Sequence, residues 1–131
     1  MNSVYPWTIA LVSTEPSSRE LMEYAIRAMF PKTIFCSSTC PRWWLENIKA
    51  QSPSAFVTSH KLYADLDGLC FSTRLKNAGF SGPIMMLSNS DELAESVSSY
   101  SIDEFLPFDR WPELPARLAS LLSSSELPEP A

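Results

Sequence analysis

The sequence predicts an α/β protein in which a five-stranded parallel sheet carries helices on both of its faces. Two observations lead to this fold class. Short apolar runs alternate five times with segments of helical periodicity, and strands that are joined through helical crossovers lie parallel to one another. The runs are also apolar along most of their length, as expected of strands covered on both faces.

The five predicted strands are short runs rich in β-branched and other apolar residues, each bounded by a turn or helix signal. They cover 8–13, 32–37, 54–60, 82–88 and 102–108. The strand lengths and the short connections favour a flavodoxin-like, doubly wound sheet with strand order 2-1-3-4-5. In such a sheet a functional site lies at the carboxyl ends of the strands.

The helices are predicted from apolar residues at helical spacing. They cover 18–30, 41–52, 69–78, 89–99 and 111–124. Ser17 and Glu20 have the spacing of a capping box, so Ser17 is the predicted N-cap of the first helix. Gly79 suits the C-cap of the third helix, and Pro115 suits the first turn of the last one.

Length and composition indicate one globular domain. The chain has 131 residues, of which 45% are hydrophobic and 19% charged, values typical of a protein that folds around a single core. We expect this domain to cover 1–124. The Ser/Pro/Glu-rich end at 125–131 is predicted to be a flexible tail, because it offers little apolar surface to bury.

The charge pattern and the cysteines exclude several classes of function. The net charge is −5 and the ten basic residues are scattered, which argues against a nucleic-acid surface. No apolar run has the roughly 20 residues of a membrane span, and the first residues lack the basic region of a signal peptide. The three cysteines have no metal-type spacing. We therefore expect a cytoplasmic protein without membrane association, metal or cofactor.

Four segments, in this order and spacing, carry a resemblance to a known family. They are ALVSTEPSSRE, AFVTSHKLYADLDGL, GPIMMLSN and SIDEFLPF. The chain resembles the CheY-like receiver domains of two-component response regulators, from about residue 7 to 124. The loop Asp67-Gly68-Leu69, Pro83 before the fourth strand and Asp103-Glu104-Phe105 at the fifth all fall in register with the family.

The resemblance also implies a phosphorylation pocket, from which this sequence departs. Active receivers carry an acidic pair after the first strand, a phosphoacceptor aspartate after the third, a hydroxyl residue after the fourth and a lysine after the fifth. Here the acidic pair falls on Ser13 and Thr14, and the phosphoacceptor falls on His60. Ser88 keeps the hydroxyl, while the lysine falls on Phe108 or is deleted.

These replacements predict a degenerate pocket. Magnesium prefers oxygen anions in an octahedral arrangement, which two hydroxyls and an imidazole cannot supply. Without the metal and the lysine, nothing offsets the charge of a transferred phosphoryl group. The resemblance therefore implies a pseudo-receiver, a stand-alone module that acts by protein contact without phosphorylation and is not an enzyme.

His60 allows several interpretations. It could accept a phosphoryl group, ligate a metal or sense pH. The interpretation that we favour is a neutral imidazole hydrogen-bonded to Ser13, Thr14 or Ser88, which fills the space of the missing acids.

Two alternatives to a pseudo-receiver remain open. The first is an active receiver whose site is rebuilt from His60 or from the acids Glu15, Asp65 and Asp67, although Asp67 is more naturally a helix-start residue. The second is a small enzyme or ligand binder that uses the strand-end crevice, with Ser13, His60 and Asp67. We expect no acid in a position to orient the imidazole, and the chain has no glycine-rich phosphate loop.

The partner surface is also implied by the resemblance. In the family, the face formed by the fourth helix, the fifth strand and the last helix docks partners or forms dimers. Here that face would contain Glu92, Glu95, Ser98, Tyr100, Phe105, Trp111 and Arg117. Trp43 is a second candidate, because Trp43 and Trp44 are adjacent on a helix and only one can face the sheet. The expected partner is a signalling kinase, a regulator, an output protein or a second copy of the chain.

Overall fold

The computed structural model describes residues 5–62, 66–89 and 101–126, with side chains through residue 123. Its five strands are all parallel and follow the order β2-β1-β3-β4-β5, which confirms the predicted fold class and topology. The strands are β1 (Thr8–Val12), β2 (Ile34–Phe35), β3 (Ala55–Ser59), β4 (Ile84–Ser88) and β5 (Glu104–Pro107). The helices are α1 (Pro16–Met29), α2 (Pro41–Asn47), α3 (Gly68–Asn77), the 3₁₀ helix η3 (Phe108–Glu113) and α4 (Leu114–Glu126).

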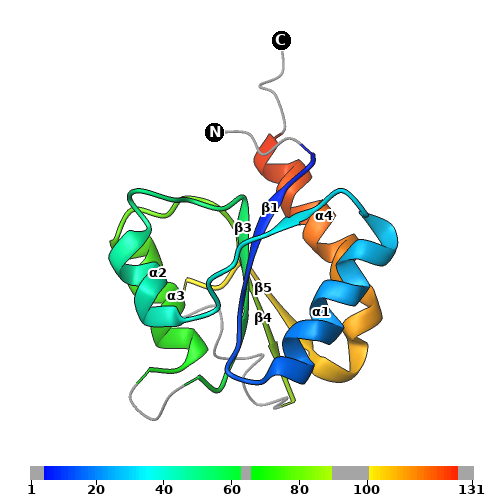
Figure 1. Cartoon of the computed structure of the whole chain (residues 1–131), viewed down its shortest axis with the longest axis horizontal. Helices are drawn as coiled ribbons and strands as arrows, with labels where there is room; N and C mark the ends of the chain where they lie inside the picture. Colours follow the sequence, from blue (N-terminus) through cyan, green and yellow to red (C-terminus); the bar gives the residue numbers. More distant parts are fainter. Residues whose placement is uncertain (1–4, 63–65, 90–100, 127–131) are drawn as a thin grey trace.

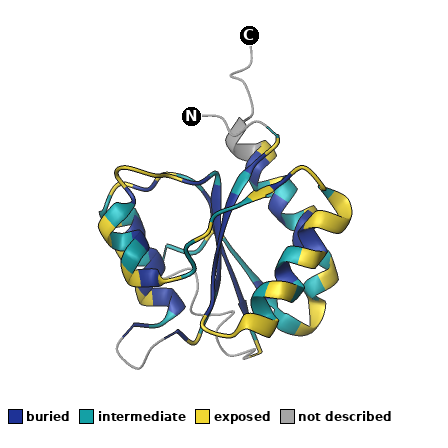
Figure 2. Cartoon of the chain, in the orientation of Figure 1, coloured by how far each residue is buried: buried dark blue, intermediate teal, exposed yellow. Residues whose placement is uncertain are grey.

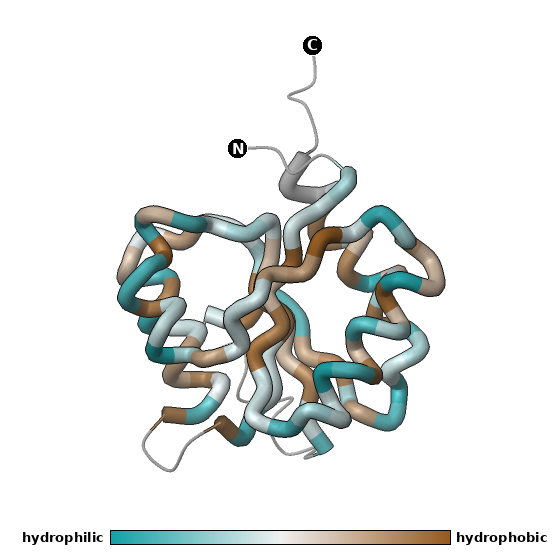
Figure 3. Tube along the Cα trace, in the orientation of Figure 1, coloured by the Kyte–Doolittle hydropathy of each residue, from teal (hydrophilic) through white to brown (hydrophobic). Residues whose placement is uncertain are grey.

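The helices cover the sheet in two layers, with α1 and α4 on one face and α2 and α3 on the other (Figure 1). Alternate residues of each strand point to opposite faces, so Ile9 and Val57 pack in the α1/α4 layer while Ala10 and Phe56 pack in the α2/α3 layer. The central strands β1, β3 and β4 are largely buried, and the exposed residues lie on the helices and loops around them (Figure 2). The hydropathy of the chain follows the same division, with apolar residues along the central strands (Figure 3).

Two elements are shorter than predicted. Only Ile34 and Phe35 of the predicted strand 32–37 pair with β1, and the Cys36 amide adds one more hydrogen bond, to the Ile9 carbonyl at 2.9 Å. The helix predicted at 41–52 ends at Asn47, where the amides of Ala50 and Gln51 both donate to the Asn47 carbonyl at 3.0 and 2.9 Å. These bonds close the helix in a turn, so the prediction of five further helical residues is wrong.

The last helix differs from the prediction at both ends. The 3₁₀ helix η3 precedes α4 and contains Pro112, whose missing amide hydrogen is unfavourable inside an α-helix that would begin at 111 or before. Pro115 lies in the first turn of α4, as expected. The helix continues to Glu126, two residues into the predicted tail. The remainder of the tail, and the helix predicted at 89–99 beyond Asn89, lie outside the described residues.

The start of α1 corrects the predicted capping box. The N-cap is Glu15 and not Ser17, Pro16 occupies the first helical position, and no side chain caps the helix. Proline is favoured at this position because its φ angle is already helical and it lacks an amide hydrogen that would need a partner. Ser17 and Ser18 are therefore residues of the first turn, beside the end of β1.

The loop before α3 is held against the end of β3. Asp67 is the N-cap of α3 and its carboxylate accepts a hydrogen bond from the Cys70 amide at 2.9 Å. The Gly68 amide donates to the His60 carbonyl at 2.6 Å. A Cβ atom at Gly68 would overlap the Ser59 carbonyl oxygen and lie 3.2 Å from Met86 Sδ. Glycine is thus required here by close approach of two backbone segments.

Within the described part of the chain, no helix combines the length and the apolar character needed to cross a membrane.

Candidate functional site

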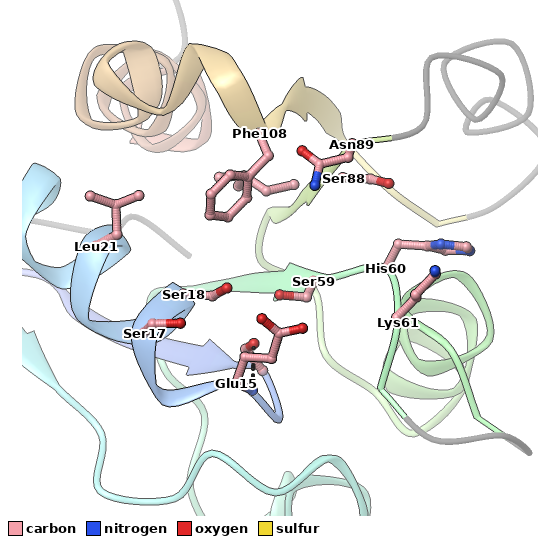
Figure 4. Close-up of a pocket in the computed structure, with 12 residues that line it drawn as sticks. Glu15, Ser17, Ser18, Leu21, Ser59, His60, Lys61, Ser88, Asn89 and Phe108 are labelled. Atoms are coloured by element: carbon pink, nitrogen blue, oxygen red, sulfur yellow. Dashed lines mark hydrogen bonds between the residues drawn. The ribbon is translucent and has the colours of Figure 1, made fainter.

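A cavity of about 740 Å³ opens where β1, β3 and β4 end, between the start of α1 and the start of η3 (Figure 4). This is the edge of the sheet where the sequence predicted a site, because the strand order reverses there. Most of the lining side chains are polar. They are Ser13, Glu15, Ser17, Ser18, Leu21, Ser59, His60, Lys61, Leu87, Ser88, Asn89 and Phe108.

The structure brings together four of the five residues predicted to form the degenerate pocket. Ser13, His60, Ser88 and Phe108 all line the cavity, although they come from segments that are far apart in sequence. Thr14 is exposed and is not part of the lining. Of the two hydroxyl residues that replace the acidic pair of active receivers, Ser13 and Thr14, only Ser13 therefore lines the cavity.

Ser13 organises the backbone at the end of β1. Its side chain is buried, with 2% exposed, and its hydroxyl accepts a hydrogen bond from the Glu15 amide at 3.2 Å. Its carbonyl oxygen accepts from Nη1 of Arg19 at 2.6 Å. These bonds fix the turn that leads into α1, so the serine has a structural role where a carboxylate would supply charge.

His60 lies beside an acid that caps the next helix. Its Nε2 is 3.7 Å from Asp67 Oδ2, too far for a hydrogen bond that would orient the imidazole. The hydrogen bond from His60 to Ser13, Thr14 or Ser88 stays a prediction. The two side chains are brought together by the loop contact between the Gly68 amide and the His60 carbonyl.

The contact between His60 and Asp67 is a close approach of two polar groups that falls short of a hydrogen bond, whose length would be about 2.7–3.2 Å. The Asp67 carboxylate is already engaged by the Cys70 amide at the start of α3. Asp67 is therefore a helix-start residue, as the sequence predicted, and its position beside the imidazole follows from that role.

The position across from Ser88 on the neighbouring strand is occupied by Pro107. Phe108 follows it, and its ring faces the cavity (Figure 4) while it also packs against the α1/α4 core. The end of β5 thus contributes a proline, and the start of η3 an aromatic ring, at this edge of the sheet. A phenyl ring gives the cavity an apolar wall and supplies no positive charge.

The described residues contain no group of three His, Cys, Asp or Glu side chains that could hold a metal ion. Asp65, one of the acids considered for a rebuilt site, lies outside those residues. Glu15 does line the cavity, together with Lys61, which the sequence reasoning did not identify.

Sequence reasoning also missed several neutral residues of the lining. Ser59 and Asn89 are neighbours in sequence of residues that were predicted, so the ends of the strands could have indicated them. Ser17, Ser18 and Leu21 come from the first turns of α1. Their position depends on where α1 begins. The sequence placed the N-cap at Ser17, two residues beyond the observed N-cap, Glu15.

The residues predicted for partner contact are only partly described. Glu92, Glu95, Ser98 and Tyr100 lie outside the described residues. Phe105 on β5 is half-buried, and the half-buried Trp111 packs against Tyr24 of α1, with ring centroids 6.5 Å apart. Trp43 is half-buried beside the fully buried Trp44, at 4.9 Å between centroids.

Arg117 belongs to an ion-pair network that joins β5, η3 and α4. Its Nη1 donates to Glu104 Oε2 at 2.6 Å, and its Nη2 donates to Glu113 Oε1 at 3.0 Å. Arg110 also pairs with Glu113, through bonds of 2.6 and 2.9 Å. The hydrogen bond from Arg110, followed by that from Arg117, holds the pKa of Glu113 below its ordinary value. The Glu104 hydrogen bond raises the pKa of Arg117, and Glu113 adds to this effect.

No protein-family model and no curated protein sequence matches the chain. Solved structures match it in three dimensions. The signal receiver domain of Mycobacterium tuberculosis NarL superposes with a TM-score of 0.75 over 94% of this chain and 98% of that one, at 15% identity. The receiver domain of Francisella response regulator 1452 gives 0.73 over 90% and 98%, at 15% identity. Salmonella typhimurium RcsB gives 0.72 over 98% and 65%, at 17% identity. The chain therefore has the fold of response-regulator receiver domains.

Proposed function

We propose that this chain, which has the fold of a receiver domain, is a pseudo-receiver that acts by protein contact and without phosphorylation. The observation that carries the proposal is the composition of the strand-end cavity. Ser13 and His60 stand where the resemblance expects a metal-binding acid and the phosphoacceptor, and both line the cavity together with Phe108.

The chemistry of these groups supports the proposal. A phosphoaspartate needs a carboxylate nucleophile, and the magnesium ion that assists its formation needs oxygen anions. Among the described residues, Glu15 is the one carboxylate that lines the cavity. Neither the buried hydroxyl of Ser13 nor the ring of Phe108 offsets the charge that a phosphoryl group would bring.

The proposed output is a contact with a signalling kinase, a regulator, an output protein or a second copy of the chain. The surface that we assign to it includes Phe105, Trp111 and Arg117, together with the residues of 92–100 named above. Trp43, on the other side of the sheet, is the second candidate. We place this activity in the cytoplasm, and we assign the chain no enzymatic activity of its own.

The test is to treat the purified chain with magnesium and acetyl phosphate, or with magnesium and beryllofluoride. We expect no mass increase corresponding to a phosphoryl group and no rise in Tm, because the cavity lacks the acidic ligands. A triple variant, Ser13→Asp, Thr14→Asp and His60→Asp, serves as a control for a restored acidic site, and circular dichroism verifies that it folds.

A phosphoryl adduct on the wild-type chain would contradict the proposal, whatever the variant does. Peptide mapping of such an adduct to His60, Glu15 or Asp65 would identify an active receiver with a rebuilt site. A magnesium-dependent rise in Tm of the wild-type chain without an adduct would equally contradict the absence of a metal site.

A further inference from the structure

Two side chains of opposite charge line the strand-end cavity without pairing. Glu15 follows β1, Lys61 follows β3, and both are exposed. Within the described residues, neither the carboxylate nor the ammonium group takes part in a hydrogen bond or an ion pair, with each other or with a third group. Figure 4 shows the two groups at separate places along the cavity, Glu15 nearer α1 and Lys61 nearer His60.

The cavity also has an apolar part. Leu21 of α1 and the ring of Phe108 lie on the side away from Lys61, where the hydroxyls of Ser17 and Ser18 also lie (Figure 4), and Leu87 of β4 contributes to the lining. Ser59 lies between Leu21 and Lys61, and its hydroxyl can either donate or accept a hydrogen bond. Along the cavity there are thus apolar side chains with hydroxyls beside them, then a carboxylate with a hydroxyl, and then an ammonium group.

We propose that this cavity binds a free α-amino acid with an apolar side chain. The ligand carboxylate pairs with the Lys61 ammonium group, the ligand ammonium group donates to the Glu15 carboxylate, and the ligand side chain packs against Leu21 and Phe108. The volume of about 740 Å³ lies within the range typical of small-molecule sites. Binding is reversible and involves no covalent step.

The two charges favour a zwitterion over a simple ion. A small anion attracted by Lys61 would also meet the Glu15 carboxylate, and a metal cation attracted by Glu15 would meet the Lys61 ammonium group. A zwitterion satisfies both groups at once, and opposite charges across a site give specificity because each suppresses the wrong partner. The apolar wall then selects the side chain.

The experiment is an NMR titration of the ¹⁵N-labelled full chain with L-phenylalanine. Two analogues isolate the charges, since 3-phenylpropanoate lacks the ammonium group and 2-phenylethylamine lacks the carboxylate. We expect L-phenylalanine to shift the amide signals of Glu15, Ser59 and Lys61. Its affinity should exceed that of each analogue by about two- to fivefold, the contribution of one solvent-accessible ion pair.

Two substitutions assign the charges to their partners. Glu15→Gln is expected to weaken the binding of L-phenylalanine and 2-phenylethylamine by about two- to fivefold, but not that of 3-phenylpropanoate, which loses a repelling carboxylate. Lys61→Gln is expected to weaken the binding of L-phenylalanine and 3-phenylpropanoate, but not that of 2-phenylethylamine, which loses a repelling ammonium group. Both side chains are exposed and unpaired in the described residues, so both variants should fold. Glu46→Gln, at an exposed position of α2, is the matched control and should change none of the affinities.

The proposal fails if L-phenylalanine shifts no cavity signal up to its limit of solubility. It also fails if the two analogues bind as tightly as the amino acid, or if both variants retain wild-type affinity for all three compounds. The titration involves neither magnesium nor a phosphoryl donor. A negative result would therefore not contradict the pseudo-receiver proposal, which is tested separately with acetyl phosphate and beryllofluoride.

Discussion

At the scale of single residues, the structure ties the strand-end cavity to a few close backbone contacts. Gly68 is the clearest case, because its amide reaches the His60 carbonyl and its Cα lies against the Ser59 carbonyl. The same contact sets the distance between His60 and Asp67. The relative position of His60 and Asp67 therefore depends on this glycine, which itself carries no functional group.

Gly68→Ala is expected to destabilise the chain by about 1–3 kcal/mol, the usual cost of an added group in a packed site. The added Cβ would overlap the Ser59 carbonyl oxygen, and the loop would have to move away from β3. Urea unfolding followed by circular dichroism measures the effect. Cys70→Ala, at an exposed position in the same turn of α3, is the control and should change the free energy of unfolding by no more than about 0.5 kcal/mol. Equal stability of the two variants would show that the loop tolerates a side chain.

At the scale of elements, the Arg117 network holds the last strand, the 3₁₀ helix and the last helix together. Glu113 lies at the end of η3 and receives hydrogen bonds from Arg110 and Arg117, while Arg117 also reaches Glu104 on β5. Because this network joins β5 to α4, it positions the surface that we assign to partner contact. The proline residues of the segment prevent a continuous α-helix, and the ion pairs fix the direction of the chain where that helix is interrupted.

The network predicts a pH dependence of stability. Because the pKa of Glu113 is lowered in the folded chain, its ion pairs stabilise the fold above the ordinary pKa of a glutamate. That stabilisation is lost as the pH falls through the lowered value in the folded chain. The difference in free energy of unfolding between the wild-type chain and Glu113→Gln should therefore shrink from neutral pH into the acid range. Urea titrations over that range test this, with Glu46→Gln as the control, whose difference from the wild-type chain should change little with pH. A constant difference for Glu113→Gln would show that its ion pairs contribute nothing.

At the scale of the whole molecule, one sheet separates two apolar layers that share its strands. Trp7 lies in the α1/α4 layer and Trp44 in the α2/α3 layer, each almost completely buried. Since every central strand contributes side chains to both layers, loss of one layer exposes the strands of the other. We therefore propose that the described chain unfolds as one domain.

Two tryptophan variants test this cooperativity. Trp43→Phe with Trp44→Phe leaves fluorescence only from the α1/α4 layer, and Trp7→Phe with Trp111→Phe leaves fluorescence only from the α2/α3 layer. In each variant the urea midpoint from fluorescence is expected to coincide with the midpoint from circular dichroism. A fluorescence transition that precedes the loss of helix in either variant would show that one layer unfolds separately.

The sequence by itself determined the fold class, the strand order and part of the strand-end site, namely Ser13, His60, Ser88 and Phe108. Apolar runs and turn residues are local signals, and a parallel sheet built from right-handed crossovers leaves few possible topologies. Asp67 at the start of α3 and Pro115 in the first turn of α4 are local signals of the same kind. Gly79 was predicted as the C-cap of α3, but the C-cap is Ala78, and Gly79 follows it with a φ of 109°.

Only the tertiary structure decided what these residues contact. The sequence favoured Ser17 as N-cap, whereas the chain begins α1 at Pro16. Only the folded chain shows that Asp67 stands 3.7 Å from the His60 imidazole. The presence of unpaired Glu15 and Lys61 in one cavity was likewise invisible, because one follows β1 and the other follows β3. The distances between these side chains depend on how the loops pack across the strand ends. The order of residues along the chain does not indicate which of several nearby polar groups will come into contact.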